Sequence, residues 1–111
     1  MNREILKGHL PVLILGILQK NPMHGYAICR EIQSRGYGEL HLQEGTLYPL
    51  LYRLEREGRI TSTWRTGPSG KKRKIYSISR SGIKLIESHK VDWRVLSSLF
   101  SDILGEEWMK S

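Results

Sequence analysis

The chain has 111 residues, of which 39% are apolar and 26% charged, so it fits one globular domain and is not a disordered protein. No apolar run reaches the length of a bilayer span, and the first residues lack the pattern of a secretory signal. We therefore expect a cytoplasmic protein with no membrane partner. The one cysteine, Cys29, excludes a disulfide within the chain.

The excess of basic charge comes from one quarter of the chain. Residues 53–80 contain nine Lys and Arg but two Glu, a difference that equals the net charge of +7 of the whole sequence. A basic excess confined in this way is typical of a surface that binds DNA, although it can also be a solvated charged face. The place of this segment in the fold has to decide between the two interpretations.

Two helices are predicted in the first third of the chain. The first covers residues 5–19, where apolar side chains recur at steps of three and four. Pro11 lies within it, and because proline fits the first turn of a helix, we expect the regular helix to begin near residues 9–10. The second helix covers residues 24–34 and is ended by Gly36 with Gly38, because glycine accepts the left-handed conformation that often follows a helix.

A third helix is predicted to begin between Gln43 and Thr46 and to end at Gly58. Its apolar residues form one stripe at steps of three and four, which consists of Leu47, Leu50, Leu51 and Leu54. If Thr46 is the N-cap, Pro49 falls among the first helical residues. Their N–H groups have no partner within the helix, so proline costs little there.

A β-hairpin and a long helix complete the chain. The strands are predicted over residues 60–66 and 73–78, on either side of the turn sequence Gly-Pro-Ser-Gly at 67–70. The last helix begins after Ser79, a typical N-cap residue, and extends towards Trp108. Its apolar residues at near-heptad spacing predict packing against a second copy of the chain, and they are Ile86, Trp93, Leu96, Phe100 and Ile103.

Three helices, a hairpin and a long helix predict a mainly α (α+β) fold, a winged helix-turn-helix with a two-stranded wing. We expect a DNA-binding domain over residues 1–79 and a dimerisation helix over residues 80–111. The third helix of such a fold enters the major groove, and the wing lies along the backbone or a minor groove. The candidate DNA contacts are therefore Thr46, Tyr48, Pro49 and Arg53 on the helix and Lys71, Lys72, Arg73 and Lys74 on the wing.

The candidate contacts on the third helix differ in chemistry. Thr46 and Arg53 have side chains suited to reading bases, whereas the hydroxyl of Tyr48 suits a phosphate. Two alternatives stay open. Tyr48 can be half-buried core, and Arg53 can pair with Glu57 at i,i+4 spacing along the helix.

Three motifs resemble, in order and spacing, those of the PadR family of bacterial transcriptional regulators. They are residues 23–28 (MHGYAI), 45–55 (GTLYPLLYRLE) and 72–79 (KRKIYSIS), and the similarity covers about residues 5–85. The resemblance implies a homodimeric repressor of palindromic operator DNA that dimerises through its C-terminal and first helices. The short tail is similar to the compact branch with a single C-terminal helix. DNA contacts are implied for Thr46, Tyr48, Pro49, Lys72, Arg73 and Lys74.

The same resemblance implies a small-molecule effector. Compact members of the family bind planar aromatic molecules between two subunits, with a tryptophan of the last helix stacked on the ligand. Trp93 is the matching residue, and we expect Val12, Leu15 or Leu96 to line the same pore. The alternative is that Trp93 only packs the dimer interface.

No enzyme is expected, because the sequence has neither a glycine-rich phosphate loop nor a nucleophile elbow. The four histidines are scattered without a metal-type spacing, so neither a metal nor a cofactor is expected. Two other classes stay possible. One is a winged-helix module that binds protein, which the lysine-rich wing disfavours, and the other is a DNA-binding protein without sequence preference.

Overall fold

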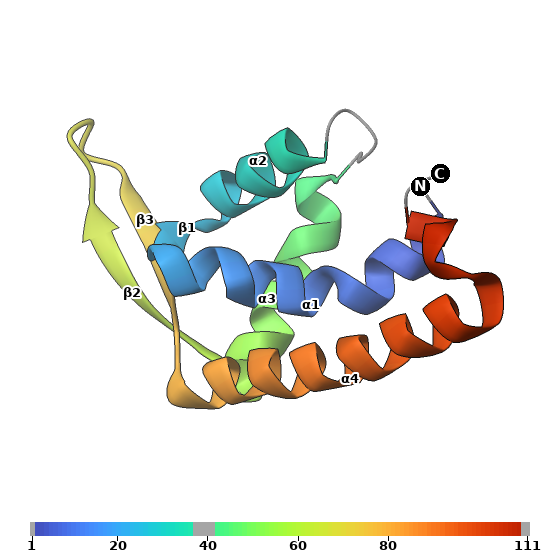
Figure 1. Cartoon of the computed structure of the whole chain (residues 1–111). Helices are drawn as coiled ribbons and strands as arrows, with labels where there is room; N and C mark the ends of the chain where they lie inside the picture. The colour runs from blue at the N-terminus through green and yellow to red at the C-terminus, as the bar shows by residue number, and fades with distance from the viewer. Residues whose placement is uncertain (1, 37–41, 110–111) are drawn as a thin grey trace.

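The structure, a computed structural model, describes residues 2–36 and 42–109. The described residues form a mainly helical α+β fold in which the helices pack on a small antiparallel sheet (Figure 1). The elements in chain order are α1 (Arg3–Lys20), β1 (Met23–His24), α2 (Gly25–Arg35), α3 (Glu44–Arg56), β2 (Ile60–Thr66), β3 (Lys72–Ile78), α4 (Arg80–Leu104) and the 3-10 turn η1 (Glu106–Met109).

One apolar core lies where α1, α2 and α3 meet the sheet and the beginning of α4. Its fully buried side chains are Leu10, Ile14, Leu15, Leu18, Ile28, Leu47, Leu51, Leu54 and Ile60. The stripe predicted on α3 is therefore buried at three positions, while Leu50 is half-buried against the core. Because burial of apolar area is the main favourable term in folding, this stripe fixes α3 with its opposite face towards solvent.

The sheet has the order β1-β3-β2, with β3 in the centre and both neighbours antiparallel to it. β2 and β3 form the predicted hairpin, and its turn is closed by the Gly67 N–H, which donates to the carbonyl of Lys71 at 2.9 Å. Gly70 in this turn has φ +82°, a conformation that favours glycine. The short strand β1 was not predicted, because two residues are too few to show alternation. It pairs His24 with Ile75 and so ties the wing to the start of α2.

The first helix begins at Arg3 and not near residues 9–10 as predicted. Asn2 caps it, since its Oδ1 accepts a hydrogen bond from the backbone N–H of Glu4 at 2.8 Å. Pro11 lies in the middle of the helix, where it removes one intrahelical hydrogen bond. Leu10 and Ile14 on either side of it are buried in the core, and this burial outweighs the lost bond.

The start of α3 also differs from the prediction. The N-cap is Gln43, without a side-chain bond, and Thr46 lies inside the first turn. Pro49 is consequently past the first helical turn, and the helix loses the bond that a residue with an N–H group at this position would donate to the carbonyl of Gly45. The prediction that Pro49 lies among the first helical residues, whose N–H groups have no partner within the helix, was wrong.

The end of α2 is the third difference. Its C-cap, Gly36, has φ −82° and is not left-handed, so the predicted glycine cap was wrong at this residue. Gly38, the other glycine of that prediction, lies outside the described residues. At the end of α2 the Gly36 N–H donates instead to the carbonyl of Gln33 at 3.1 Å. The end of α3 is different, because Gly58, which follows the C-cap Glu57, has φ +77°.

The last helix begins as predicted, with the Oγ of Ser79 accepting from the Gly82 N–H at 3.2 Å. It ends at Leu104, because Gly105 adopts φ +91° and η1 follows, so the predicted extension towards Trp108 was wrong. Figure 1 shows α4 running alongside α1. Within the described ranges, no helix is both long and apolar enough to cross a membrane.

Candidate nucleic-acid interface

The outer face of α3 carries the residues predicted to meet DNA. Thr46, Tyr48, Pro49 and Arg53 are all exposed, on the side opposite the buried leucines. Tyr48 is also packed, because its Cε1 lies so close to Gly25 that a Cβ there would approach it to 2.7 Å. Desolvation is the main cause that raises the pKa of the Tyr48 hydroxyl, which therefore stays protonated and able to donate a hydrogen bond.

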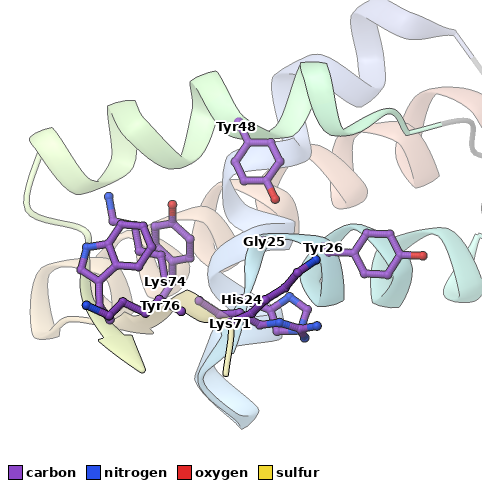
Figure 2. Close-up of a pocket in the computed structure, with 10 residues that line it drawn as sticks. His24, Gly25, Tyr26, Tyr48, Lys71, Lys74 and Tyr76 are labelled. Atoms are coloured by element: carbon purple, nitrogen blue, oxygen red, sulfur yellow. The ribbon is translucent and has the colours of Figure 1, made fainter. Parts of the chain in front are cut away.

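A hollow of about 600 Å³ separates α3 from the wing and the start of α2 (Figure 2). In Figure 2 the Tyr48 ring projects from α3 towards Gly25, across from Lys71 and Tyr76. Basic and aromatic side chains dominate the lining, which consists of His24, Gly25, Tyr26, Tyr48, Trp64, Lys71, Lys72, Arg73, Lys74 and Tyr76. Ammonium, guanidinium and hydroxyl donors of this kind are the groups that contact phosphates in protein–DNA complexes.

The four basic side chains of the wing are not equivalent. Lys71, Lys72 and Arg73 are exposed. Lys74 is half-buried, and its ammonium pairs with the Glu55 carboxylate of α3 at 3.1 Å. The hydrogen bond to Glu55 is the main cause that raises the pKa of Lys74. The charge of Lys74 is therefore matched within the protein, in contrast to its neighbours.

Glu55 joins three elements at this point. Its carboxylate on α3 accepts a short hydrogen bond from the Ser62 hydroxyl of β2 as well as the bond from Lys74 of β3. The bond from Ser62 is the largest cause that lowers the pKa of Glu55, and the contacts with Lys74 lower it further. Lys74 also lies over the ring of buried Tyr76, with its nitrogen 5.6 Å from the ring centroid. These contacts set the angle between the wing and α3.

Arg59 shows that a basic residue of the same segment can have a purely internal role. Its Nη1 donates to both the carbonyl and the hydroxyl of Ser81 at 3.0 Å. The hydroxyl of Ser79 lies within hydrogen-bond distance of the Gly58 and Arg59 carbonyls. Arg59 thus helps to join the end of α3 to the start of α4.

Sequence reasoning missed several residues that line the hollow. His24 and Tyr26 belong to the MHGYAI motif, but no role in the site was predicted for them. Trp64 is 66% exposed on β2 and faces the solvent beside Lys74, its partner in the hairpin register. An exposed tryptophan on a basic hairpin was a usable signal, because large exposed apolar side chains mark interaction surfaces.

The structure places the residues predicted to hold an aromatic ligand in three different locations. Trp93 and Val12 meet in an apolar hollow of about 370 Å³ between α1 and α4. The rest of its lining consists of Ile5, Leu6, His9, Leu13 and His89. Leu96 is exposed on α4 and does not line this hollow. Leu15 is fully buried in the protomer core, so it does not reach a surface that a ligand or a second subunit can share.

The imidazole of His9 contacts the Trp93 ring edge to face, with ring centroids 5.9 Å apart, and His89 at 5.4 Å.

In residues 2–36 and 42–109, His, Cys, Asp and Glu side chains do not gather in groups of three or more that could hold a metal ion. Cys29 is buried, and burial is the main cause that raises the pKa of its thiol.

Comparison with known proteins agrees with this geometry. The model of the transcriptional regulator PadR-like family matches residues 14–88. The chain is 31% identical over 103 residues to the transcriptional regulator Rv3488 of Mycobacterium tuberculosis, covering 93% of this chain and 90% of that protein. Among solved structures, a PadR-like transcriptional regulator from Bacillus cereus is similar with a TM-score of 0.79 at 32% identity, over 91% of this chain and 96% of that one.

A PadR family transcriptional regulator from Eggerthella lenta is similar to the same degree, with a TM-score of 0.79 at 33% identity over 91% of this chain and 86% of that one. The resemblance seen in the three motifs is thereby confirmed. The family model spans more than half of the sequence, and the relatives cover most of it. This chain belongs to the PadR-like family of transcriptional regulators.

Proposed function

We propose that this regulator is a sequence-specific DNA-binding protein that acts as a homodimeric repressor on a palindromic operator. The observation that carries the proposal is the hollow that α3 shares with the wing, since Tyr48 of α3 and the exposed Lys71, Lys72 and Arg73 line it together. Charge and architecture thus coincide on one surface, where α3 can enter the major groove and the wing can follow the backbone.

The test is a fluorescence anisotropy titration of the protein with the DNA upstream of its own gene and with a scrambled control, at physiological salt. We expect nanomolar binding to the upstream DNA and binding at least about a thousandfold weaker to the scramble. Equal and weak binding to both would favour a DNA-binding protein without sequence preference. No binding to either would favour a winged-helix module that binds protein.

We further propose that the dimer forms through α4 with help from α1, the arrangement expected for a DNA-binding domain of residues 1–79 joined to a dimerisation helix of residues 80–111. Apolar side chains at least 41% exposed continue along both helices, and they are Ile5, Leu13, Val91, Trp93, Val95, Leu96, Leu99, Ile103 and Leu104. Clustered, exposed apolar side chains mark interaction surfaces. Footprinting should protect two half-sites about one helical turn, roughly 10 bp, or a multiple apart.

We also propose that a planar aromatic effector binds this regulator. Trp93 and Val12 line an apolar hollow on the face proposed for dimerisation, which is a setting suited to a planar aromatic ligand. An uncharged acridine should quench tryptophan fluorescence in the native chain and in the Trp64→Phe control, and release the protein from DNA. A quench of equal size in Trp93→Ala would mean that Trp93 only packs the interface.

A further inference from the structure

His24 has two neighbours that its neutral ring cannot satisfy together. As the N-cap of α2, its Nδ1 accepts a hydrogen bond from the backbone N–H of Ala27 at 3.3 Å. Its Nε2 lies 2.9 Å from Nη1 of Arg73. A neutral imidazole has one nitrogen that donates and one that accepts. When Nδ1 keeps the bond from Ala27, Nε2 carries the hydrogen and faces a guanidinium that can also only donate.

The ring is neutral at physiological pH, because burial first, and then the charge of Arg73, lowers the pKa of His24. In the tautomer that keeps the cap of α2, two donors, one from the start of α2 and one from β3, therefore face each other at 2.9 Å. The acceptor that suits two converging donors, one of them a cation, is the oxygen of an anion.

The surroundings of this pair carry further positive charge. His24 and Arg73 line a second hollow of about 530 Å³ on the outer side of α2, together with Arg30. Tyr26 connects them, because its ring is nearly parallel to that of His24 and its centroid lies 5.7 Å from the Arg30 guanidinium. The acidic residue of this hollow, Glu31, is bound by Arg35 at 2.7 Å, and within residues 2–36 and 42–109 neither Arg30 nor Arg73 forms an ion pair.

We propose that Arg73 and the Nε2–H of His24 bind a phosphate of the DNA backbone, and that Arg30 extends this contact along α2. The proposal rests on the proposed DNA-binding function and adds a second element to the interface. His24, Tyr26 and Arg73 line both hollows. A DNA strand whose backbone follows the wing would therefore continue over the start of α2.

His24→Asn is the decisive variant. Asparagine is a favoured N-cap and keeps an oxygen that accepts from the first turn of α2, but its shorter side chain does not reach the place of Nε2. We expect unchanged thermal stability and about tenfold weaker binding to both upstream and scrambled DNA, the size of one hydrogen bond to a charged group.

Arg30→Met tests the extension along α2. It should reduce the slope of log K against log salt by about 0.9, the value for one phosphate contact. The matched control is Lys90→Met, which changes the net charge equally on α4, where Lys90 lies 3.3 Å from Glu87. The control should leave the slope unchanged.

The imidazole NMR signals of His24 provide a readout independent of affinity. The free protein should show the tautomer protonated at Nε2, and DNA should shift the Nε2 resonance, whereas inorganic phosphate at the same phosphate concentration should not. An equal shift with inorganic phosphate would indicate a site for free anions and overturn the assignment to DNA. Native affinity in His24→Asn and Arg30→Met would overturn it too, while failure of the native chain to bind DNA would instead contradict the proposed function.

Discussion

At the scale of single residues, the basic charge of residues 53–80 divides into residues that hold the protein together and residues that are free to bind DNA. Lys74 and Arg59 have partners in α3 and α4, whereas Lys71 and Lys72 are exposed. The sequence predicts the charge of this segment but not the pairing of each residue, since Glu55 meets Lys74 and Ser81 meets Arg59 only after the chain has folded. Counting every lysine of the wing as a phosphate contact would therefore overestimate the salt dependence of binding.

Replacement of the two lysines by methionine should separate these roles. We expect Lys72→Met to reduce the salt slope of DNA binding by about 0.9, and Lys74→Met to leave the slope unchanged while it loosens the wing. Anisotropy titrations between 50 and 300 mM salt, designed to span about a twofold change of Debye length, measure both slopes. Equal reductions would show that Lys74 leaves Glu55 and contacts phosphate in the complex. Lys74→Arg, which keeps the pair with Glu55, should retain native affinity.

The link between Glu55 and its two partners should also be visible in acid. The pKa of Glu55 is lowered in the folded state, so its contribution to stability is fully present above the unfolded pKa of about 4.3 and is lost as the pH falls through the folded value. We expect Glu55→Gln to melt at a lower temperature than the native chain at pH 7, and the gap to close as the pH falls towards 3. A gap that is the same at both pH values would mean that the carboxylate charge is not what stabilises this junction.

At the scale of elements, features that depend on neighbouring residues were predicted correctly from the sequence, whereas features that depend on distant contacts were not. The leucine stripe of α3, the Gly-Pro-Ser-Gly turn and the Ser79 cap all lie where the sequence places them, because each depends on residues close in the chain. The strand β1 and the continuation of α1 through Pro11 depend on contacts with distant elements. The candidate site follows the same rule. The exposed face of α3 was predictable from its leucine stripe, but the proposed role of His24 was not, because it depends on contact with the distant Arg73.

The junction between α4 and the segment before β2 depends on the absence of a side chain at Gly82. A Cβ there would lie 2.3 Å from the carbonyl oxygen of Arg59 and 2.7 Å from Ile78, so backbone has to move. We expect Gly82→Ala to destabilise the fold by about 3 kcal/mol, at the upper end for overpacking. Gly16→Ala, in a helix position with no neighbour within 4 Å, is the control and should be neutral or stabilising by up to about 1 kcal/mol. Urea unfolding measures both, and equal stability of the two variants would contradict this packing.

At the scale of the whole molecule, the proposed DNA-binding surface and the exposed apolar face lie on different elements. The first is built by α2, α3 and the wing, and the second runs along α4 and α1. Near-heptad spacing predicted the α4 part of this face at Trp93, Leu96, Phe100 and Ile103. It was wrong at Ile86, which is buried in the core of the protomer. Which partner covers it stays a prediction.

Leu99→Asp tests the dimer, because Leu99 is 50% exposed on α4 and a carboxylate there would be buried without a partner in the proposed interface. We expect the dissociation constant of the dimer to rise about a hundredfold, as measured by sedimentation velocity over a range of concentrations. Ser98→Asp adds the same charge at the neighbouring exposed position and should remain dimeric. A native sedimentation coefficient for Leu99→Asp would place the interface elsewhere.

If the apolar face of α4 forms the proposed dimer, the regulator is also sensitive to its own abundance. If two copies must associate before both half-sites are engaged, mass action makes operator occupancy rise more steeply than in proportion to the protein present. Dilution removes the stabilising partner and the second DNA contact at the same time, so folding and repression decline together. In that arrangement the long helix α4, whose apolar side is uncovered in the single subunit, would give the promoter a threshold instead of a graded response.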